Sequence, residues 1–181
     1  SQFLTGLLMA FAAAGAADCT IKVNQLKSKP YIDLTLSVLK HFGWEVNHIQ
    51  HEQFSFKPRT SVKEKIEYTV EGDWSGAAFL LVAGAIAGPI SVKGLQLNST
   101  QADKAVMNAL ESANASILID QDKITIGANE EGLKAFEFDA TDCPDLFPPL
   151  VTLASLCKGT SMIKGVNRLA HKESDRGITL Q

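Results

Sequence analysis

The sequence predicts an α/β fold built from repeated βαβαββ units of about 71 residues. Three sets of positions recur at intervals of 71 residues: Ile21-Lys22, Val92-Lys93 and Ile163-Lys164; Phe3, Trp74 and Asp145; and Pro30, Gln101 and Lys172. The first set lies in short strand patterns, the second opens apolar helix patterns, and the third opens a second helix pattern in each copy. Because a unit of this size is a small domain, we expect several copies around a common axis, with the apolar helices at the centre and the sheets outside.

The first copy shows the order of elements most clearly. Residues 2–14 are apolar nearly all round, as in a buried helix. An amphipathic helix follows, with an i, i+4, i+7, i+10 stripe from Ile32 to Phe42, and it ends at Gly43. Short strands are predicted at 20–23, 45–49 and 53–56, and the polar segment 58–65 is predicted to be a loop.

The second and third copies repeat this order. In the second copy we expect strands at 66–70, 90–92, 116–119 and 123–126, and helices at 75–87 and 102–113. The third copy enters through Phe136 and Phe138, forms a helix from Asp145 to Leu156 and a strand at 161–166, and starts a second helix near His171.

The composition is that of a soluble globular protein of one or two domains. The chain has 181 residues, a net charge of -3 and 45% hydrophobic residues. A charge this close to neutral gives no reason to expect nucleic-acid binding. The apolar run 3–17 is too short for a membrane span and lacks the basic flank of a signal peptide, so we expect no membrane association.

The cysteines and histidines indicate neither a disulfide framework nor a metal centre. Cys19, Cys143 and Cys157 lie far apart without a C-x-x-C pair, as expected for reduced thiols of a cytoplasmic protein. Three histidines in the first copy lack ligand spacing and are interpreted as surface residues: His41, His48 and His51. The sequence therefore predicts no metal site.

The segment Leu169–Arg176 gathers cations and carboxylates directly after the last predicted strand. On a helix that starts near His171, Lys172 and Arg176 lie at i and i+4 and share a face, with Glu173 beside them as a carboxylate that can move a proton. Helix N-termini favour anions, and a guanidinium can bind a phosphate or carboxylate in bidentate fashion. The same pattern is typical of a solvated helix start, so spacing alone leaves both interpretations open.

Four motifs occur in order along the chain: Ser1-Gln2-Phe3-Leu4-Thr5, Ser28-Lys29-Pro30-Tyr31-Ile32-Asp33, Glu71-Gly72-Asp73 and Lys172-Glu173-Ser174-Asp175-Arg176. Pro144-Asp145 lies between the last two. With these motifs the sequence resembles the 5-enolpyruvylshikimate-3-phosphate synthase family (3-phosphoshikimate 1-carboxyvinyltransferases). The resemblance covers the whole chain. Because the chain also lacks an initiator Met, and starts and stops inside predicted helices, we expect a fragment from the middle of a longer enzyme.

The resemblance implies a two-lobed enolpyruvyl transferase fold, an inside-out α/β barrel. Residues 1–71 would be the last βαβαββ unit of the shikimate-phosphate lobe. Residues 72–181 would be the first one and a half units of the second lobe. The implied reaction transfers the enolpyruvyl group of phosphoenolpyruvate to the 5-hydroxyl of shikimate 3-phosphate and releases phosphate. It requires no metal or organic cofactor, and the resemblance implies a monomeric cytoplasmic enzyme without nucleic-acid or membrane partners.

The resemblance also implies the role of individual residues. Ser1, Gln2, Ser28 and Tyr31 match positions that hold shikimate 3-phosphate, with Ser28 donating to its phosphate. Asp145 matches the carboxylate near the target hydroxyl and is the expected general base. Three residues of the charged segment complete the expected site: Lys172 contacts that hydroxyl, Glu173 shuttles a proton at the phosphoenolpyruvate carbon, and Arg176 binds anionic groups of phosphoenolpyruvate.

Two alternatives remain open from the sequence. A UDP-N-acetylglucosamine enolpyruvyl transferase would have the same repeat and a related reaction, although the Ser28-Lys29-Pro30-Tyr31 and Lys172–Arg176 motifs argue against it. The other alternative is a non-catalytic, truncated domain, because the family's other basic residues fall outside these 181 positions. We therefore expect the isolated chain to be inactive.

Overall fold

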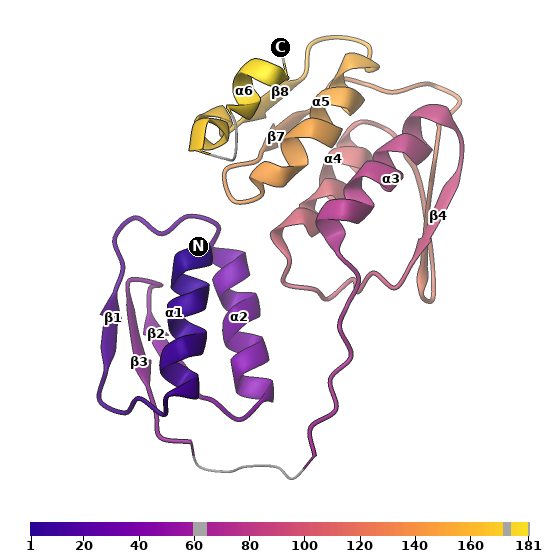
Figure 1. The fold of residues 1–181 in the computed structure, drawn as a ribbon. Coiled ribbons are helices and arrows are strands. Elements are labelled where there is room, and N and C mark those ends of the chain that lie inside the picture. The colour runs from indigo at the N-terminus through magenta and orange to yellow at the C-terminus, as the bar shows by residue number, and fades with distance from the viewer. Residues whose placement is uncertain (60–64, 172–174, 181) are drawn as a thin grey trace. The chain divides into compact units, whose positions relative to one another are not determined.

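The computed structural model describes residues 1–59, 65–171 and 175–180, which fold into two compact α/β units. Unit 1 spans Ser1–Thr69 and unit 2 spans Val70–Gln181 (Figure 1). Each unit has its own hydrophobic core. Within the described ranges, every helix is too short or too polar to traverse a lipid bilayer.

Unit 1 is a three-stranded sheet with two helices on one face (Figure 1). Its elements are α1 (Gln2–Ala13), β1 (Thr20–Lys22), α2 (Lys29–His41), β2 (Val46–Ile49) and β3 (Gln53–Phe56). The central strand β3 pairs antiparallel with both neighbours. Its two phenylalanines, Phe54 and Phe56, alternate inward and are buried against Leu8 of α1 and Ile32 of α2. Alternation along β3 and the helical stripe of α2 therefore produce one shared core.

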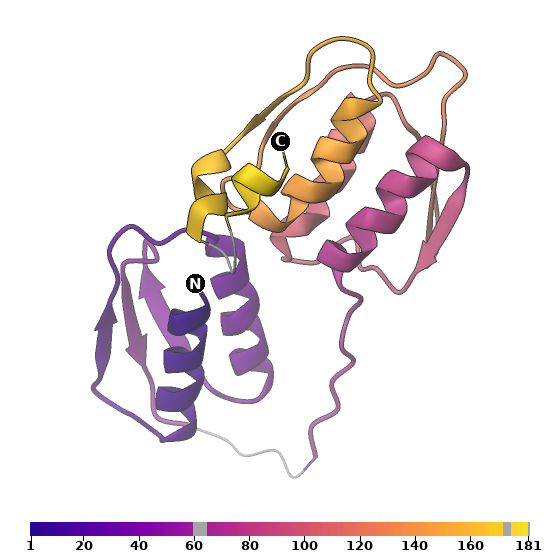
Figure 2. The same cartoon turned by 45° about the horizontal axis from the view of Figure 1, so that its top comes forward.

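The two helices of unit 1 begin at the same end of the sheet, as Figures 1 and 2 show. Further along, the hydroxyl of Thr5 in the first turn of α1 lies 3.0 Å from that of Thr35 in the second turn of α2, and the contact links the two helices. Thr35 Oγ1 also donates to the carbonyl oxygen of Tyr31 at 2.8 Å. The N-terminal halves of the two helices are thus held together by side chains that are buried or half-buried in the unit.

Unit 2 contains the second copy of the repeat and part of the third. Its elements are α3 (Trp74–Ala87), β4 (Ile90–Lys93), η1 (Ala102–Ala105), α4 (Val106–Ser112), β5 (Ser116–Asp120), β6 (Lys123–Gly127), β7 (Glu137–Asp139), η2 (Pro144–Leu146), α5 (Phe147–Ser155), β8 (Met162–Lys164), η3 (Val166–His171) and α6 (Arg176–Thr179). The strand order is β4-β6-β5 in one antiparallel sheet, and β7 pairs parallel with β8. Helices α3 and α5 pack side by side (Figures 1 and 2).

The start of α3 is fixed by two polar side chains. Asp73 caps the helix by accepting hydrogen bonds from the N–H groups of Ser75 and Gly76, both at 3.0 Å. The Gln101 side chain accepts from Trp74 N and donates to the carbonyl oxygen of Gly72, both at 2.9 Å. Together they explain why the Glu71-Gly72-Asp73 motif leads directly into a helix.

The predicted α/β class is confirmed. In both three-stranded sheets, the two strands joined through a helix run in the same direction, on either side of a strand antiparallel to both. The predicted helices at 102–113 and 145–156 each begin with a 3-10 turn, η1 and η2, before the α-helical part.

The strand predicted at 66–70 is wrong, because these residues have no strand pairing. Glu67 and Tyr68 of this segment instead contact the C-terminal end of α2. His41 Nε2 lies 2.9 Å from the carbonyl oxygen of Glu67, and the Tyr68 ring packs on His41 and Phe42 with centroid distances of 4.9 and 5.7 Å. A backbone group bonded to a side chain in this way is not available to a sheet ladder.

Candidate functional site

The expected site residues of unit 1 lie at the starts of α1 and α2. Ser1 is the N-cap of α1 and Gln2 its first residue, and both are exposed. Ser28 is the N-cap of α2, and Tyr31 lies half-buried in the first turn. Because both helices begin at the same end of the unit, the positive ends of two helix dipoles face the same side (Figure 1). This arrangement favours an anion.

Ser28 has an unusual backbone conformation. Its φ and ψ are 54° and 48°, in the left-handed region, and the residue is only 3% exposed. A left-handed conformation costs a non-glycine residue roughly 1–2 kcal/mol. The side chain does not cap α2, while the Ser28 carbonyl accepts from Tyr31 N at 3.2 Å. Pro30 in the first turn fixes φ there. The left-handed backbone and the burial of Ser28 therefore help to fix where its side chain lies.

In unit 2 the structure brings Asp145 and Arg176 together. Arg176 Nη1 donates to Asp145 Oδ1 at 2.9 Å, across 31 residues of sequence. Asp145 lies in η2, held in place by the buried Leu146 and Phe147, and Arg176 is the first residue of α6. The Arg176 side chain is 29% exposed and that of Asp145 is 41% exposed. The sequence predicted both as site residues but did not predict that they contact each other.

The helix predicted to start near His171 begins five residues later. His171 ends the 3-10 turn η3, and α6 starts at Arg176 because Asp175 caps it, accepting from Gly177 N at 3.0 Å. The predicted i, i+4 pairing of Lys172 with Arg176 lies partly outside the described residues and stays a prediction. Lys172 and Glu173 themselves lie outside the described residues.

The one cysteine beside this site is not a nucleophile. Cys143 is buried, and burial raises the pKa of its thiol to about 12, with Asp103, Asp142, Asp139 and Asp145 adding negative charge nearby. A thiol held protonated in this way is unreactive at neutral pH.

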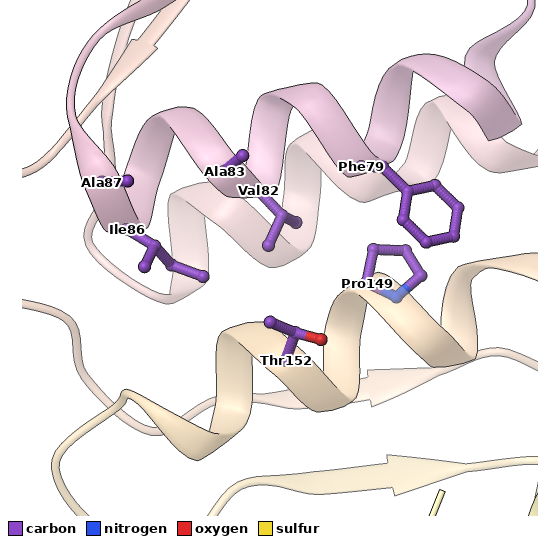
Figure 3. Close-up of a pocket in the computed structure, with 7 residues that line it drawn as sticks. All are labelled: Phe79, Val82, Ala83, Ile86, Ala87, Pro149 and Thr152. Carbon is purple, nitrogen blue, oxygen red and sulfur yellow. The ribbon is translucent and has the colours of Figure 1, made fainter. Parts of the chain in front are cut away.

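An apolar groove of about 220 Å³ lies between α3 and α5 in the same unit. Figure 3 shows the side chains of Phe79, Val82 and Ile86 facing Pro149 and Thr152 across it. Its one hydroxyl, on Thr152, donates to the carbonyl oxygen of Pro148 at 3.0 Å. Without a cation or a row of N–H donors, this groove is unsuited to an anionic ligand.

The structure also gathers three residues that the sequence did not connect. Asp33, His48 and His51 each offer one potential metal-ligating atom, and these atoms all lie within 4.8 Å of one another. His48 lies in β2 and His51 in the tight turn that joins β2 to β3, and the sequence analysis did not predict this turn. Gln50 and His51 both have positive φ (51° and 61°), so the chain reverses within two residues.

The comparisons with known proteins agree on one family. A family model described as EPSP synthase (3-phosphoshikimate 1-carboxyvinyltransferase) matches residues 1–180. The chain is 39% identical over 176 residues to the 3-phosphoshikimate 1-carboxyvinyltransferase of Clostridium botulinum (strain Alaska E43 / Type E3). It is 41% identical over 177 residues to that of Methanocorpusculum labreanum. These alignments cover 97% of this chain but only 40% and 41% of the relatives, so the chain spans about two-fifths of their length.

Two solved structures share the fold. The EPSP synthase from Acinetobacter baumannii aligns with a TM-score of 0.68 and 23% identity, over 81% of this chain and 35% of that chain. The enolpyruvyl transferase NikO from Streptomyces tendae aligns with a TM-score of 0.67 and 18% identity, over 88% of this chain and 38% of that chain. At these identities the likeness concerns the fold alone.

Proposed function

The chain belongs to the EPSP synthase (3-phosphoshikimate 1-carboxyvinyltransferase) family, and on this premise we propose the activity of the complete enzyme that contains it. That enzyme transfers the enolpyruvyl group of phosphoenolpyruvate to the 5-hydroxyl of shikimate 3-phosphate and releases inorganic phosphate. The observation that carries the proposal is the contact of Asp145 with Arg176, two expected site residues 31 positions apart. A carboxylate and a guanidinium side by side offer a base and an anion binder to the same substrate pair.

We further propose that unit 1 supplies the shikimate 3-phosphate contacts. Ser1, Gln2, Ser28 and Tyr31 lie at two helix starts that face one side of the unit. Helix N-termini attract phosphate through their unpaired N–H groups and their dipole. The left-handed, buried Ser28 is a strained residue of the kind found at binding sites, and strain at such a position supports a role in holding the ligand.

In the proposed reaction Asp145 removes the proton of the 5-hydroxyl as its oxygen bonds to the central carbon of phosphoenolpyruvate. Glu173 supplies a proton to the methylene carbon, and Lys172 stabilises the charge that develops at the oxygen. Loss of phosphate from the resulting tetrahedral intermediate breaks its carbon–oxygen bond, and Glu173 takes back a proton from the methyl group to restore the double bond. Arg176 binds anionic groups of phosphoenolpyruvate, for which it must exchange Asp145 for the substrate.

The proposed lobes follow the repeat. Residues 1–71 form the last unit of the shikimate-phosphate lobe, and residues 72–181 form the first one and a half units of the other lobe. The resemblance further supports a monomeric, cytoplasmic complete enzyme without a cofactor, and gel filtration of that enzyme tests the monomer. Because the chain spans about 40% of the length of its relatives, we propose that it does not turn over by itself.

The test is phosphate release measured with phosphoenolpyruvate and shikimate 3-phosphate together. In the complete enzyme, Asp145→Asn should lower kcat by about 10²-fold or more while the variant stays folded. Asp142→Asn is the matched control, because it removes an exposed carboxylate three residues away and should leave the rate near that of the wild type. Near-native turnover in Asp145→Asn would remove Asp145 from the mechanism, and substantial turnover by the isolated 181-residue chain would refute the proposed inactivity.

A further inference from the structure

We propose that Asp33, His48 and His51 form a binding site for a divalent transition-metal ion, with Zn²⁺ as the best fit. One ligand atom from each side chain lies within 4.8 Å of the other two. The three residues come from three parts of unit 1: the first turns of α2, the end of β2 and the turn that follows it. The hairpin turn and the helix must both fold for these atoms to meet.

Small movements of the Asp33 and His51 side chains would make room for an ion between them. His51 Nε2 lies 2.6 Å from Asp33 Oδ1. Tetrahedral ligands about 2.0–2.1 Å from a zinc ion are about 3.3 Å apart, so this pair, now 2.6 Å apart, has to separate by about 0.7 Å. The Asp33 side chain is 43% exposed, which leaves it room to move. On binding, the proton between the two atoms is released to water and the ion takes its place.

His48 can supply the third ligand, because doing so breaks only one weak hydrogen bond. Its Nδ1 accepts from His51 N at 3.3 Å, longer than the usual 2.7–3.2 Å range of such bonds. This contact indicates a lone pair on Nδ1 that is only weakly used. The His48 side chain is exposed, so its other ring nitrogen can keep a proton and donate it to water. A neutral imidazole with one free lone pair is the form that binds metal.

The donor set selects the class of metal. Two imidazole nitrogens and one carboxylate oxygen suit Zn²⁺, Co²⁺, Ni²⁺ or Cu²⁺, whereas Mg²⁺ and Ca²⁺ prefer all-oxygen sites. Three protein ligands leave a fourth position for water or an external ligand.

The site is separate from the proposed substrate contacts. At about 100° per residue, Asp33 lies roughly 200° around α2 from Tyr31. The metal therefore binds on a different side of the helix from the residues proposed for shikimate 3-phosphate. Its expected effect is on stability, because it ties the β2–β3 hairpin to α2 and binds only the folded unit.

The Asp33–His48–His51 cluster could also have a purely structural role. The His48 and His51 rings lie 4.1 Å apart and pack against Phe54 at 5.8 and 6.5 Å, so the cluster can act as aromatic packing plus one hydrogen bond. His48→Phe keeps a ring at this position but removes a ligand. His41→Phe is the matched control, because it removes a histidine of the same unit that contacts Glu67 and Tyr68 instead.

The experiment is a Zn²⁺ titration of the full chain against a chromophoric competitor, with Co²⁺ spectra and thermal melts in parallel. We expect one ion bound per wild-type chain in this site, Co²⁺ bands without a thiolate charge-transfer component, and a melting temperature that rises with Zn²⁺. His48→Phe and Asp33→Asn should each weaken binding at least about tenfold and abolish the rise, while His41→Phe should retain both. Equal Zn²⁺ affinity in His48→Phe and the wild type, or a loss confined to His41→Phe, would overturn the site.

Discussion

The ion pair between Asp145 and Arg176 can be tested by a double-mutant cycle. The variants are Asp145→Asn, Arg176→Gln and the double variant, each compared in the free energy of unfolding. The contact is a charge-assisted hydrogen bond of 2.9 Å, but its side chains are 41% and 29% exposed. Exposed pairs of this kind contribute about 0.2–1 kcal/mol, because water screens the charges and both side chains lose freedom. We therefore expect a coupling energy of about 0.5–1 kcal/mol.

Urea unfolding followed by tryptophan fluorescence measures this energy in unit 2. Trp74 is fully buried in that unit, and Trp44 lies in unit 1, so a Trp44→Phe background makes the signal report on unit 2 alone. The cycle is run at about 0.01 M and about 1 M salt, between which the Debye length falls from about 30 Å to about 3 Å. The coupling should shrink at high salt.

The size of this coupling bears directly on the proposed chemistry. In the proposed reaction Arg176 releases Asp145 when it binds an anionic substrate, and a weak ion pair keeps the free-energy cost of that exchange low. A coupling above about 2 kcal/mol that does not respond to salt would indicate a desolvated structural pair. That result would contradict both the exposure-based reasoning and the proposed exchange of partners.

Two further predictions concern the packing and titration of the core. Gly84→Ala should cost about 1–3 kcal/mol of unfolding free energy, because its new Cβ would lie 2.6 Å from the carbonyl oxygen of Ile126. Gly6→Ala is the control, because Gly6 also lies inside a helix but a Cβ there would have no atom within 4 Å. This variant should be neutral or stabilise by up to about 1 kcal/mol. Equal effects of the two substitutions in urea unfolding would refute the packing argument. Cys143 has a thiol pKa raised from 9.0 to about 12 by burial, so above pH 9 the unfolded chain loses this proton while the folded chain keeps it. The unfolding free energy should therefore fall as pH rises from about 9, with a slope of up to about 1.4 kcal/mol per pH unit from this group. The fall should be smaller in Cys143→Ala. An identical pH dependence in that variant would contradict the assignment of the effect to the Cys143 thiol.

Periodicity was sufficient to predict most elements of the fold. The stripe from Ile32 to Phe42 and the alternating Phe54 and Phe56 lie where their spacing placed them, with Ile32 and both phenylalanines in one core. The 71-residue repeat was informative because it compares three copies of one pattern. It gave the helix starts at Phe3 and Trp74 to within one residue.

The errors arose where side-chain contacts outweigh local pattern. Residues 66–70 alternate like a strand, but His41 and Tyr68 direct that segment to the end of α2. The last helix starts at Arg176 rather than near His171 because Asp175 caps it. The Asp33–His48–His51 cluster was missed because its ligand spacing exists only after the hairpin has turned and α2 has packed.

The three copies of the repeat share one kind of contact between their helices. In each copy, a polar contact joins the first helix to the second close to where both begin. Thr5 contacts Thr35 in the first copy, and the Gln101 side chain contacts Trp74 N in the second. In the third copy the contact is Arg176 with Asp145. The 71-residue step does not relate these three pairs position by position, because it takes Trp74 and Gln101 to Asp145 and Lys172. The first two pairs are neutral, whereas the third is charged, so a polar contact near the helix starts recurs in the fold but is made by different positions in each copy.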